Sequence, residues 1–299
     1  METRSPAKRS SEAVGMLSGL AAYSLWGLFP LYWKSLSAVS ALQILAHRVV
    51  WAFLFTSILT VVFKKTQMVI ELFHDTKRLA ATLGAGVLVT ANWGIYIWAV
   101  NSGHITQSSL GYYLNPLVSV VLGALVLREK IDRGMLAATI IAAVGIAILT
   151  ISIGELPWIS LTLAATFALY GLIKKIAHLD TMVGLAMETA PVAPIAVAYL
   201  IMQNGAGLGA FVHDGFLATA LLVIAGPVTA IPLMFYAEGV KRVAFSRIGF
   251  LQYISPTLQL SLGLFGYGEK LNAPQAVAFG FVLAALLVFA LSRKGVSRR

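Results

Sequence analysis

The stretch Tyr113-Leu114-Asn115-Pro116 opens an apolar run that ends in Arg128-Glu129-Lys130, and Tyr253-Ile254-Ser255-Pro256 opens a second run that ends in Gly268-Glu269-Lys270. A shift of 140 positions superimposes the two, with Tyr on Tyr, Pro on Pro and Glu-Lys on Glu-Lys. Proline and charged residues are scarce in this chain, so these matches weigh more than the Leu and Gly matches between them. A helix of membrane length that occurs once in each half indicates a duplicated helical bundle.

Composition places the chain in a bilayer. Its 299 residues are 59% hydrophobic and only 11% charged, with a mean hydropathy of +0.84, whereas a soluble domain carries about 25% charged residues. The net charge of +10 comes from basic clusters between apolar runs, a placement typical of membrane topology and not of nucleic-acid binding. The absence of cysteine excludes disulfides, thiolate metal sites and cysteine nucleophiles.

No enzymatic motif stands out along the chain. It contains no glycine loop of the kind that binds phosphate, no paired ligands at metal spacing and no nucleophile elbow. The sequence also lacks an extramembrane segment long enough for an ATPase. We therefore expect a non-enzymatic protein with no metal and no cofactor.

Ten apolar segments approach the roughly 20 residues that cross a bilayer core. We expect the first to be a retained helix and not a cleaved signal peptide. Backbone groups in lipid must be satisfied within the segment, so the predicted class is all-α. The predicted spans are residues 14–33, 41–63, 79–101, 107–127, 134–153, 158–176, 181–203, 216–240, 245–267 and 273–291.

The basic residues predict the orientation. Nineteen of the 22 Lys and Arg lie on one side, in both termini and alternate loops, and only Lys34 and Lys270 lie on the other. The positive-inside rule then places both the N- and the C-terminus in the cytoplasm. Lys34 and Lys174, at helix ends, are expected to extend their amines to the interface.

Ten helices and one duplication give two five-helix repeats. Because five is odd, the second copy must enter the membrane from the opposite side, which makes the repeat inverted. The predicted organisation is a disordered cytoplasmic tail (1–12), a first repeat (13–153), a second repeat (154–292) and a basic cytoplasmic tail (293–299). The terminal Glu-Lys pairs are interpreted as interfacial anchors. Residues 64–78 between the second and third spans fit either a short interfacial helix or a solvated loop.

Two charges lie near the middle of predicted spans, where charge is costly. The 140-residue offset aligns Arg48 with Glu188. In one reading Glu188 carries a coupling proton or meets a cationic group of a substrate, while Arg48 meets an anionic group. In the other, the two form a permanent pair that locks the halves together. His47, beside Arg48, is either a titrating group or a hydrogen-bonded packing residue.

Other mid-span polar and aromatic side chains are candidates for lining a pathway, although tyrosine and tryptophan also form interfacial belts. These candidates are Asn92, Trp93, Tyr112, Tyr113, Asn115, Gln252, Tyr253 and Ser255, and Tyr23 and Trp26 could join them.

Mid-span prolines are candidate hinges, since each removes a backbone hydrogen bond. Pro116 and Pro256 occupy equivalent points of the two repeats, and Pro227 and Pro232 interrupt the eighth span. Spans five and ten carry small residues at helical spacing and few polar groups, which predicts tight packing away from any pore.

With ten helices, inverted repeats and a proline before Glu-Lys in spans four and nine, the chain resembles the drug/metabolite transporter superfamily with two EamA domains. Shorter strings resemble its bacterial RarD group, labelled chloramphenicol-sensitive protein: His47-Arg48-Val49-Val50-Trp51, Met187-Glu188-Thr189, residues 226–233 and residues 252–256. The resemblance implies a secondary transporter of the bacterial plasma membrane, usually an exporter of small metabolites or drug-like solutes.

We therefore expect a transporter that works by alternating access, surrounded by lipid and carrying a small molecule, with proton coupling left open. An uptake permease of the same fold is the first alternative. A membrane-embedded enzyme or sensor, or a non-transporting scaffold, is a more distant one.

Overall fold

The computed structural model describes residues 6–102, 104–154, 157–266, 268 and 272–297, and its regular secondary structure there is entirely helical. The helices are α1 (Pro6–Lys34), α2 (Ala41–Val62), α3 (Thr66–His74), α4 (Thr76–Asn101), α5 (Ile105–Leu125), α6 (Arg133–Ile153), α7 (Trp158–Ala177), α8 (Thr181–Thr189), α9 (Ala193–Gly205), α10 (Gly215–Arg242), α11 (Phe245–Leu251), α12 (Ile254–Ser261), the π-helix η1 (Leu262–Gly266) and α13 (Ala273–Ser297).

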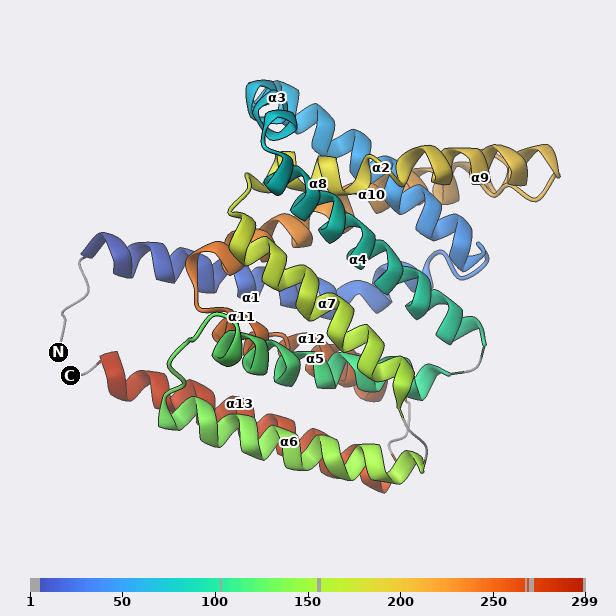
Figure 1. The fold of residues 1–299 in the computed structure, drawn as a ribbon. Coiled ribbons are helices and arrows are strands. Elements are labelled where there is room, and N and C mark those ends of the chain that lie inside the picture. The colour runs from blue at the N-terminus through green and yellow to red at the C-terminus, as the bar shows by residue number, and fades with distance from the viewer. Residues whose placement is uncertain (1–5, 103, 155–156, 267, 269–271, 298–299) are drawn as a thin grey trace.

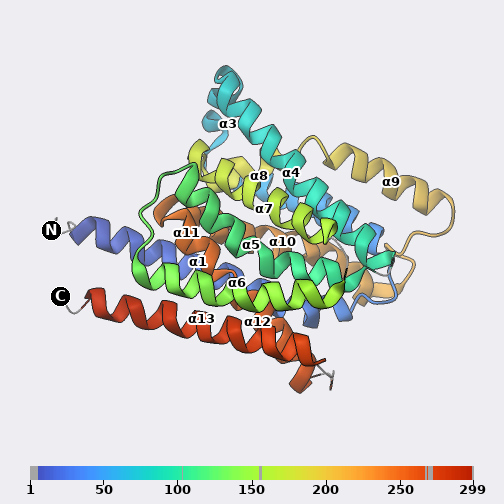
Figure 2. The same ribbon diagram turned by 60° about the horizontal axis from the view of Figure 1, so that its bottom comes forward.

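The long helices form a bundle in which they run back and forth between two ends (Figure 1). The start of α1 and the end of α13 lie at the same end of the bundle in both views (Figure 2). At the other end α9 projects outwards beyond its neighbours.

Eight described helices are long and apolar enough to cross a membrane, or nine if the bent pair α8–α9 is one span. Many side chains on their outer faces are large and apolar, such as Leu17, Ile151 and Ile201, each more than 60% exposed. Such a surface suits lipid and not water. The chain is therefore a multi-pass membrane protein.

Two of the ten predicted spans are not continuous helices. Residues 181–203 divide into α8 and α9, bent by 50°, because Pro191 and Pro194 supply no backbone N–H donor at the junction. Residues 245–266 divide into α11, α12 and η1. The ring of Pro256 would meet the carbonyl of Gln252 in a straight helix, and the helix breaks at residues 252–253.

The first helix begins earlier than the predicted start at residue 14. Residues 6–12, expected to be disordered, belong to α1, and Glu12 pairs with Arg247 at 2.6 Å. The 64–78 segment contains the short helix α3, which buries Leu72 against Leu179 and Val183.

Helices α6 and α13, which cover the predicted fifth and tenth spans, lie side by side along their length (Figures 1 and 2). A Cβ added at Gly145 would lie 2.5 Å from the Cβ of Phe281. Ala138, Ala142 and Ala285 are fully buried. The prediction of a tightly packed pair of small-residue faces is confirmed, and neither helix contributes to the central cavity described below.

Several contacts between helices occur as matched pairs under the 140-residue correspondence. Helix α1 packs on α10 and on α12, while α7 packs on α4 and on α5. Helix α2 packs on α10, while α8 packs on α4. Each of these contacts from a helix of the first half to a helix of the second half therefore has a counterpart in which the two halves exchange roles.

Glu129, interpreted above as an interfacial anchor, instead caps a helix of the other half. Its carboxylate accepts hydrogen bonds from the backbone N–H of Phe245, at 2.6 Å, and of Ser246, at 2.9 Å. These donors begin α11 and have no partner within the helix. The equivalent residue, Glu269, lies outside the described residues.

Candidate functional site

A cavity of about 390 Å³ lies in the middle of the bundle between the two halves of the chain. Its lining reaches Trp33 and Ala41, at the end of the bundle away from the termini. The predicted candidates that line it are Arg48, Asn92, Trp93, Tyr112, Asn115, Gln252 and Ser255, joined by Trp26.

Arg48 is the one charged side chain among the described residues that line this cavity. Its Nε donates a hydrogen bond to Thr229 Oγ1 at 3.0 Å. Its guanidinium carbon lies 4.8 Å from the ring centre of Trp33 and 5.1 Å from that of Trp93. Aromatic faces at such distances attract a cation.

The cavity amides are held by backbone carbonyls of neighbouring helices. Asn92 donates to the carbonyl of Leu163 at 2.8 Å and to Thr166 Oγ1 at 2.9 Å. Asn115 donates to the carbonyl of Ala164 at 3.3 Å. Both side chains thus bind α7. These bonds join α4 and α5 of the first half to α7 of the second half at the wall of the cavity.

Aromatic rings close the cavity towards the end where the chain termini lie. Tyr23 and Tyr170 are fully buried and Tyr236 nearly so. The ring of Tyr236 contacts those of Tyr23 and Tyr170, and each of the three tyrosine rings contacts Trp26 or Phe167, with centres 5.5–6.2 Å apart. Only Trp26 and Phe167 reach the cavity, so the three tyrosines form a layer behind it.

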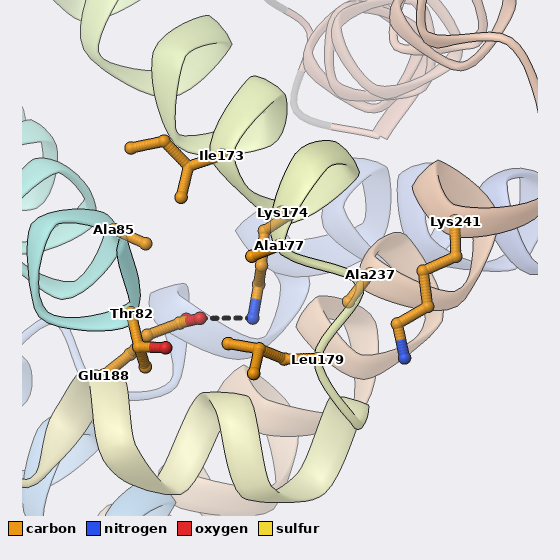
Figure 3. Close-up of a pocket in the computed structure, with 9 residues that line it drawn as sticks. All are labelled: Thr82, Ala85, Ile173, Lys174, Ala177, Leu179, Glu188, Ala237 and Lys241. Atoms are coloured by element: carbon orange, nitrogen blue, oxygen red, sulfur yellow. Dashed lines mark hydrogen bonds and ion pairs between the residues drawn. The ribbon is translucent and has the colours of Figure 1, made fainter. Parts of the chain in front are cut away.

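Glu188 lies beyond this layer and does not pair with Arg48. Its carboxylate forms an ion pair with Lys174 and accepts a hydrogen bond from the hydroxyl of Tyr170 at 3.1 Å. Figure 3 shows the Lys174 ammonium directed at Glu188 beside a small cavity of about 10 Å³, while Lys241 is turned away. The hypothesis of an Arg48–Glu188 pair was therefore wrong.

The expected position of Lys174 was wrong as well. Its side chain is only 6% exposed and does not extend to the interface. The sequence placed it at a helix end, beside Lys175, and gave no sign that a buried carboxylate lay across from it.

Three other candidates lie away from the cavity. His47 faces α9 and Phe211, and its Nδ1 accepts a hydrogen bond from Trp51 at 3.2 Å. Tyr253 is buried against Phe250, and Tyr113 packs against the main core. His47 thus has the hydrogen-bonded packing role that was one of its two predicted alternatives, whereas Tyr113 and Tyr253 do not line the cavity.

Sequence reasoning missed several cavity residues. Trp33 was read as a helix end, Thr229 only as part of a proline-containing string, and Gln259 was not singled out. Gln259 donates to the carbonyl of Trp26 at 3.1 Å. Thr229 lies between Pro227 and Pro232, a signal that could have drawn attention to it.

Polar contacts reinforce the closed end. Lys175 donates to the carbonyls of Val240, at 2.8 Å, and of Val243, at 2.6 Å. Lys65 pairs with Asp180 at 2.6 Å. Burial alone would raise the pKa of Asp180, but the hydrogen bonds from Lys65 and two backbone N–H groups hold that pKa below its usual value.

No group of three or more His, Asp or Glu in the described part of the chain is arranged to hold a metal ion.

Comparison with known proteins gives concordant matches. Residues 13–151 match the EamA-like transporter family. An uncharacterized transporter of Bacillus subtilis, YojE, is 42% identical over 93% of this chain and 94% of its own length. Proteins named RarD from Streptomyces exfoliatus and Escherichia coli are 37% and 36% identical over 97% and 95% of this chain, and 92% and 96% of their own lengths.

A solved crystal structure has the same fold. It superimposes with a TM-score of 0.70 at 17% identity, over 94% of this chain and 98% of the solved one.

Proposed function

Since this chain belongs to the EamA-like transporter family of membrane transporters, in the drug/metabolite transporter superfamily and its RarD group, we propose that it exports a small organic solute by alternating access around the central cavity. The observation that carries the proposal is a cavity whose lining reaches one end of the bundle, while aromatic and charged layers close the other. A transporter in one of its two states has a central site that is open to one side of the membrane and closed to the other.

The matched contacts between halves support two inverted five-helix repeats. A site on the axis between such repeats can be exposed to either side when one half tilts against the other. The cavity draws its lining from both halves, as this geometry requires. The charge distribution supports cytoplasmic termini in a bacterial plasma membrane, which makes the closed end cytoplasmic and the state outward-facing.

The two equivalent prolines support the rocking motion. Helix α5 runs without a break through Pro116, whereas the corresponding stretch of the second half is broken before Pro256. The repeats thus differ at the point where the sequence predicts hinges. In the opposite state we expect the break to pass to the first half.

The Lys174–Glu188 pair contributes to the cytoplasmic gate in this proposal. It links α7 to α8, beside the tyrosine layer. The pair has no net charge, whether the proton between the two groups lies on Lys174 or on Glu188. Glu188 is therefore better suited to hold the gate than to couple a proton. Transport by Glu188→Gln should change in rate but retain its pH dependence, and a lost pH dependence would restore the coupling role.

Alternating access can be tested by labelling, because the chain has no cysteine. Single cysteines at Ile44, in the cavity, and at Ala237, behind the tyrosine layer, would be treated with a membrane-impermeant maleimide from each side. We expect Ile44→Cys to react from outside and Ala237→Cys to react from inside only when the protein turns over. Proteoliposomes that move no solute under any gradient would favour the sensor or scaffold alternatives.

A further inference from the structure

Arg48 is a charge in the membrane interior without a counter-charge among the described residues. Glu188, the acid that the sequence pairs with it, is held by Lys174 instead. Among the residues that the structure describes, none that lines the cavity is Asp or Glu. A lone charge at such depth is costly and marks a site for a ligand or ion.

The contacts of Arg48 leave its binding edge available. Guanidinium has five N–H donors, and only the Nε donor has an acceptor among the described residues, Thr229. The two Nη atoms have no hydrogen-bond partner among the described residues, and neither of them is fully buried. Both are therefore accessible from the cavity. Planar Nη donors form paired hydrogen bonds with a carboxylate.

The flanking rings hold this edge in place. Trp33 comes from the end of α1 and Trp93 from the middle of α4, and the guanidinium lies close to both rings. Thr229, from α10, fixes the third side. Three helices therefore orient one cation towards the cavity.

The remainder of the cavity is apolar and aromatic with a few amides. Phe29, Ile44, Leu45, Phe167 and Leu233 are among its lining residues. Flat apolar groups bind well between such side chains. A cationic amine would find no carboxylate there and would be repelled by Arg48.

We propose that the solute of this cavity is an organic anion with a flat apolar body, whose carboxylate binds Arg48. The inference rests on the proposed function, since it names the class of solute that the same cavity carries. An inside-negative membrane potential drives an anion outwards. Export of such a solute therefore needs no coupled proton, in keeping with the pairing of Glu188.

Three probes of one shape and different charge test the charge preference: 2-naphthoate, 2-naphthamide and 2-naphthamidine. Calorimetric titration of the purified protein in detergent should show naphthoate binding about tenfold or more tightly than naphthamide, as a charge-assisted pair implies, and naphthamidine binding weakest. Equal affinities, a preference for the amidine, or no binding of naphthoate would overturn the proposal.

Variants locate the effect. Arg48→Gln should lose the preference for naphthoate over naphthamide, and Arg48→Lys should keep part of it, because charge remains but the paired donors do not. Arg78→Gln removes an exposed guanidinium near the start of α4 and should bind naphthoate like the unaltered protein. If Arg48→Gln does not fold, the probe series on the unaltered protein and on Arg48→Lys still decides.

Flux separates this inference from the proposed function. In proteoliposomes with an imposed potassium-diffusion potential, naphthoate should move towards the positive side. Binding of naphthoate without movement of any probe would refute transport and leave the anion site intact. Movement of naphthamidine in preference to naphthoate would leave transport intact and refute the anion site.

Discussion

Lys174 and Glu188 form an ion pair in which the two side chains are 6% and 0% exposed, across the junction of α7 and α8. Breaking a buried pair leaves one charge uncompensated. The pair should therefore matter more to stability than ion pairs at the surface, such as that of Glu238 with Arg242.

A double-mutant cycle measures this coupling. Glu188→Gln and Lys174→Met should each lower the free energy of unfolding by about 3–5 kcal/mol, whereas the double variant should recover a large part of the loss. Thermal unfolding in detergent gives the comparison. Arg242→Gln, at the exposed pair, is the control and should cost less than about 1 kcal/mol. Additive losses in the double variant would show that the two charges do not depend on each other.

Two glycines of α4 offer a matched test of helix packing. A Cβ at Gly86 would lie 2.4 Å from the backbone oxygen of Glu188, whereas one at Gly84 meets nothing within 4 Å. Gly86→Ala should force α4 from α8 and lower the free energy of unfolding by about 1–3 kcal/mol. Gly84→Ala should be neutral or slightly stabilising, because alanine favours helix. Equal effects would contradict the close approach of α4 and α8.

Acid should weaken the contact between Lys65 and Asp180. Since the folded protein holds the pKa of Asp180 below its usual value of 3.8, this carboxylate adds stability above that value and loses it as pH falls through the folded pKa. Asp180 also caps α8 through the N–H groups of Met182 and Val183. Asp180→Ala should cost about 1 kcal/mol at neutral pH.

That difference should shrink as pH falls below 3.8 and through the lower pKa of the folded protein, because the carboxyl of the unaltered protein then becomes protonated. Unfolding temperatures of both proteins between pH 7 and pH 3 provide the measurement. Lys65→Met should remove the part of the effect that comes from the ion pair. A difference that persists unchanged at low pH would mean that Asp180 acts without its charge.

The prolines of the two repeats should differ in effect. Pro256→Ala restores the N–H that a continuous helix needs between α11 and α12, and should slow transport by favouring a straight second repeat. Pro116→Ala should leave this outward-facing state stable, because α5 is already continuous, but impede the opposite state. Maleimide labelling of Ile44→Cys in each background reports the balance. Identical labelling in both would argue against a hinge pair.

The sequence predicted the fold where long apolar segments decide it. Eight predicted spans correspond to eight single helices, because hydropathy over about 20 residues reports a property of the helix itself. It did not predict the helix breaks within residues 181–203, where Pro191 and Pro194 divide an apolar segment, or within residues 245–266, which carry several polar residues beside Pro256. Hydropathy does not register a missing N–H.

Prediction of the site was limited for a different reason. Depth in the membrane identified Arg48, Asn92 and Asn115 as polar groups that need partners, but depth does not specify which helices are neighbours. Lys174 lies only 14 positions before Glu188, and the turn between α7 and α8 brings them together. His47 and Arg48 are adjacent in the chain yet face different cavities, since neighbours on a helix point about 100° apart.

The pairing of α6 with α13 bears on how the protein is made. Gly134 and Gly145 approach Ser292 and Phe281 so closely that an added Cβ would clash. During synthesis the face of α6 that packs on α13 enters the membrane long before α13 does. Lipid must cover this face until the final helix emerges from the ribosome. A chain terminated before α13 would leave this face of α6 without its partner. The face could then bind the α13 of a complete copy of the protein and disturb the folding of that copy as well.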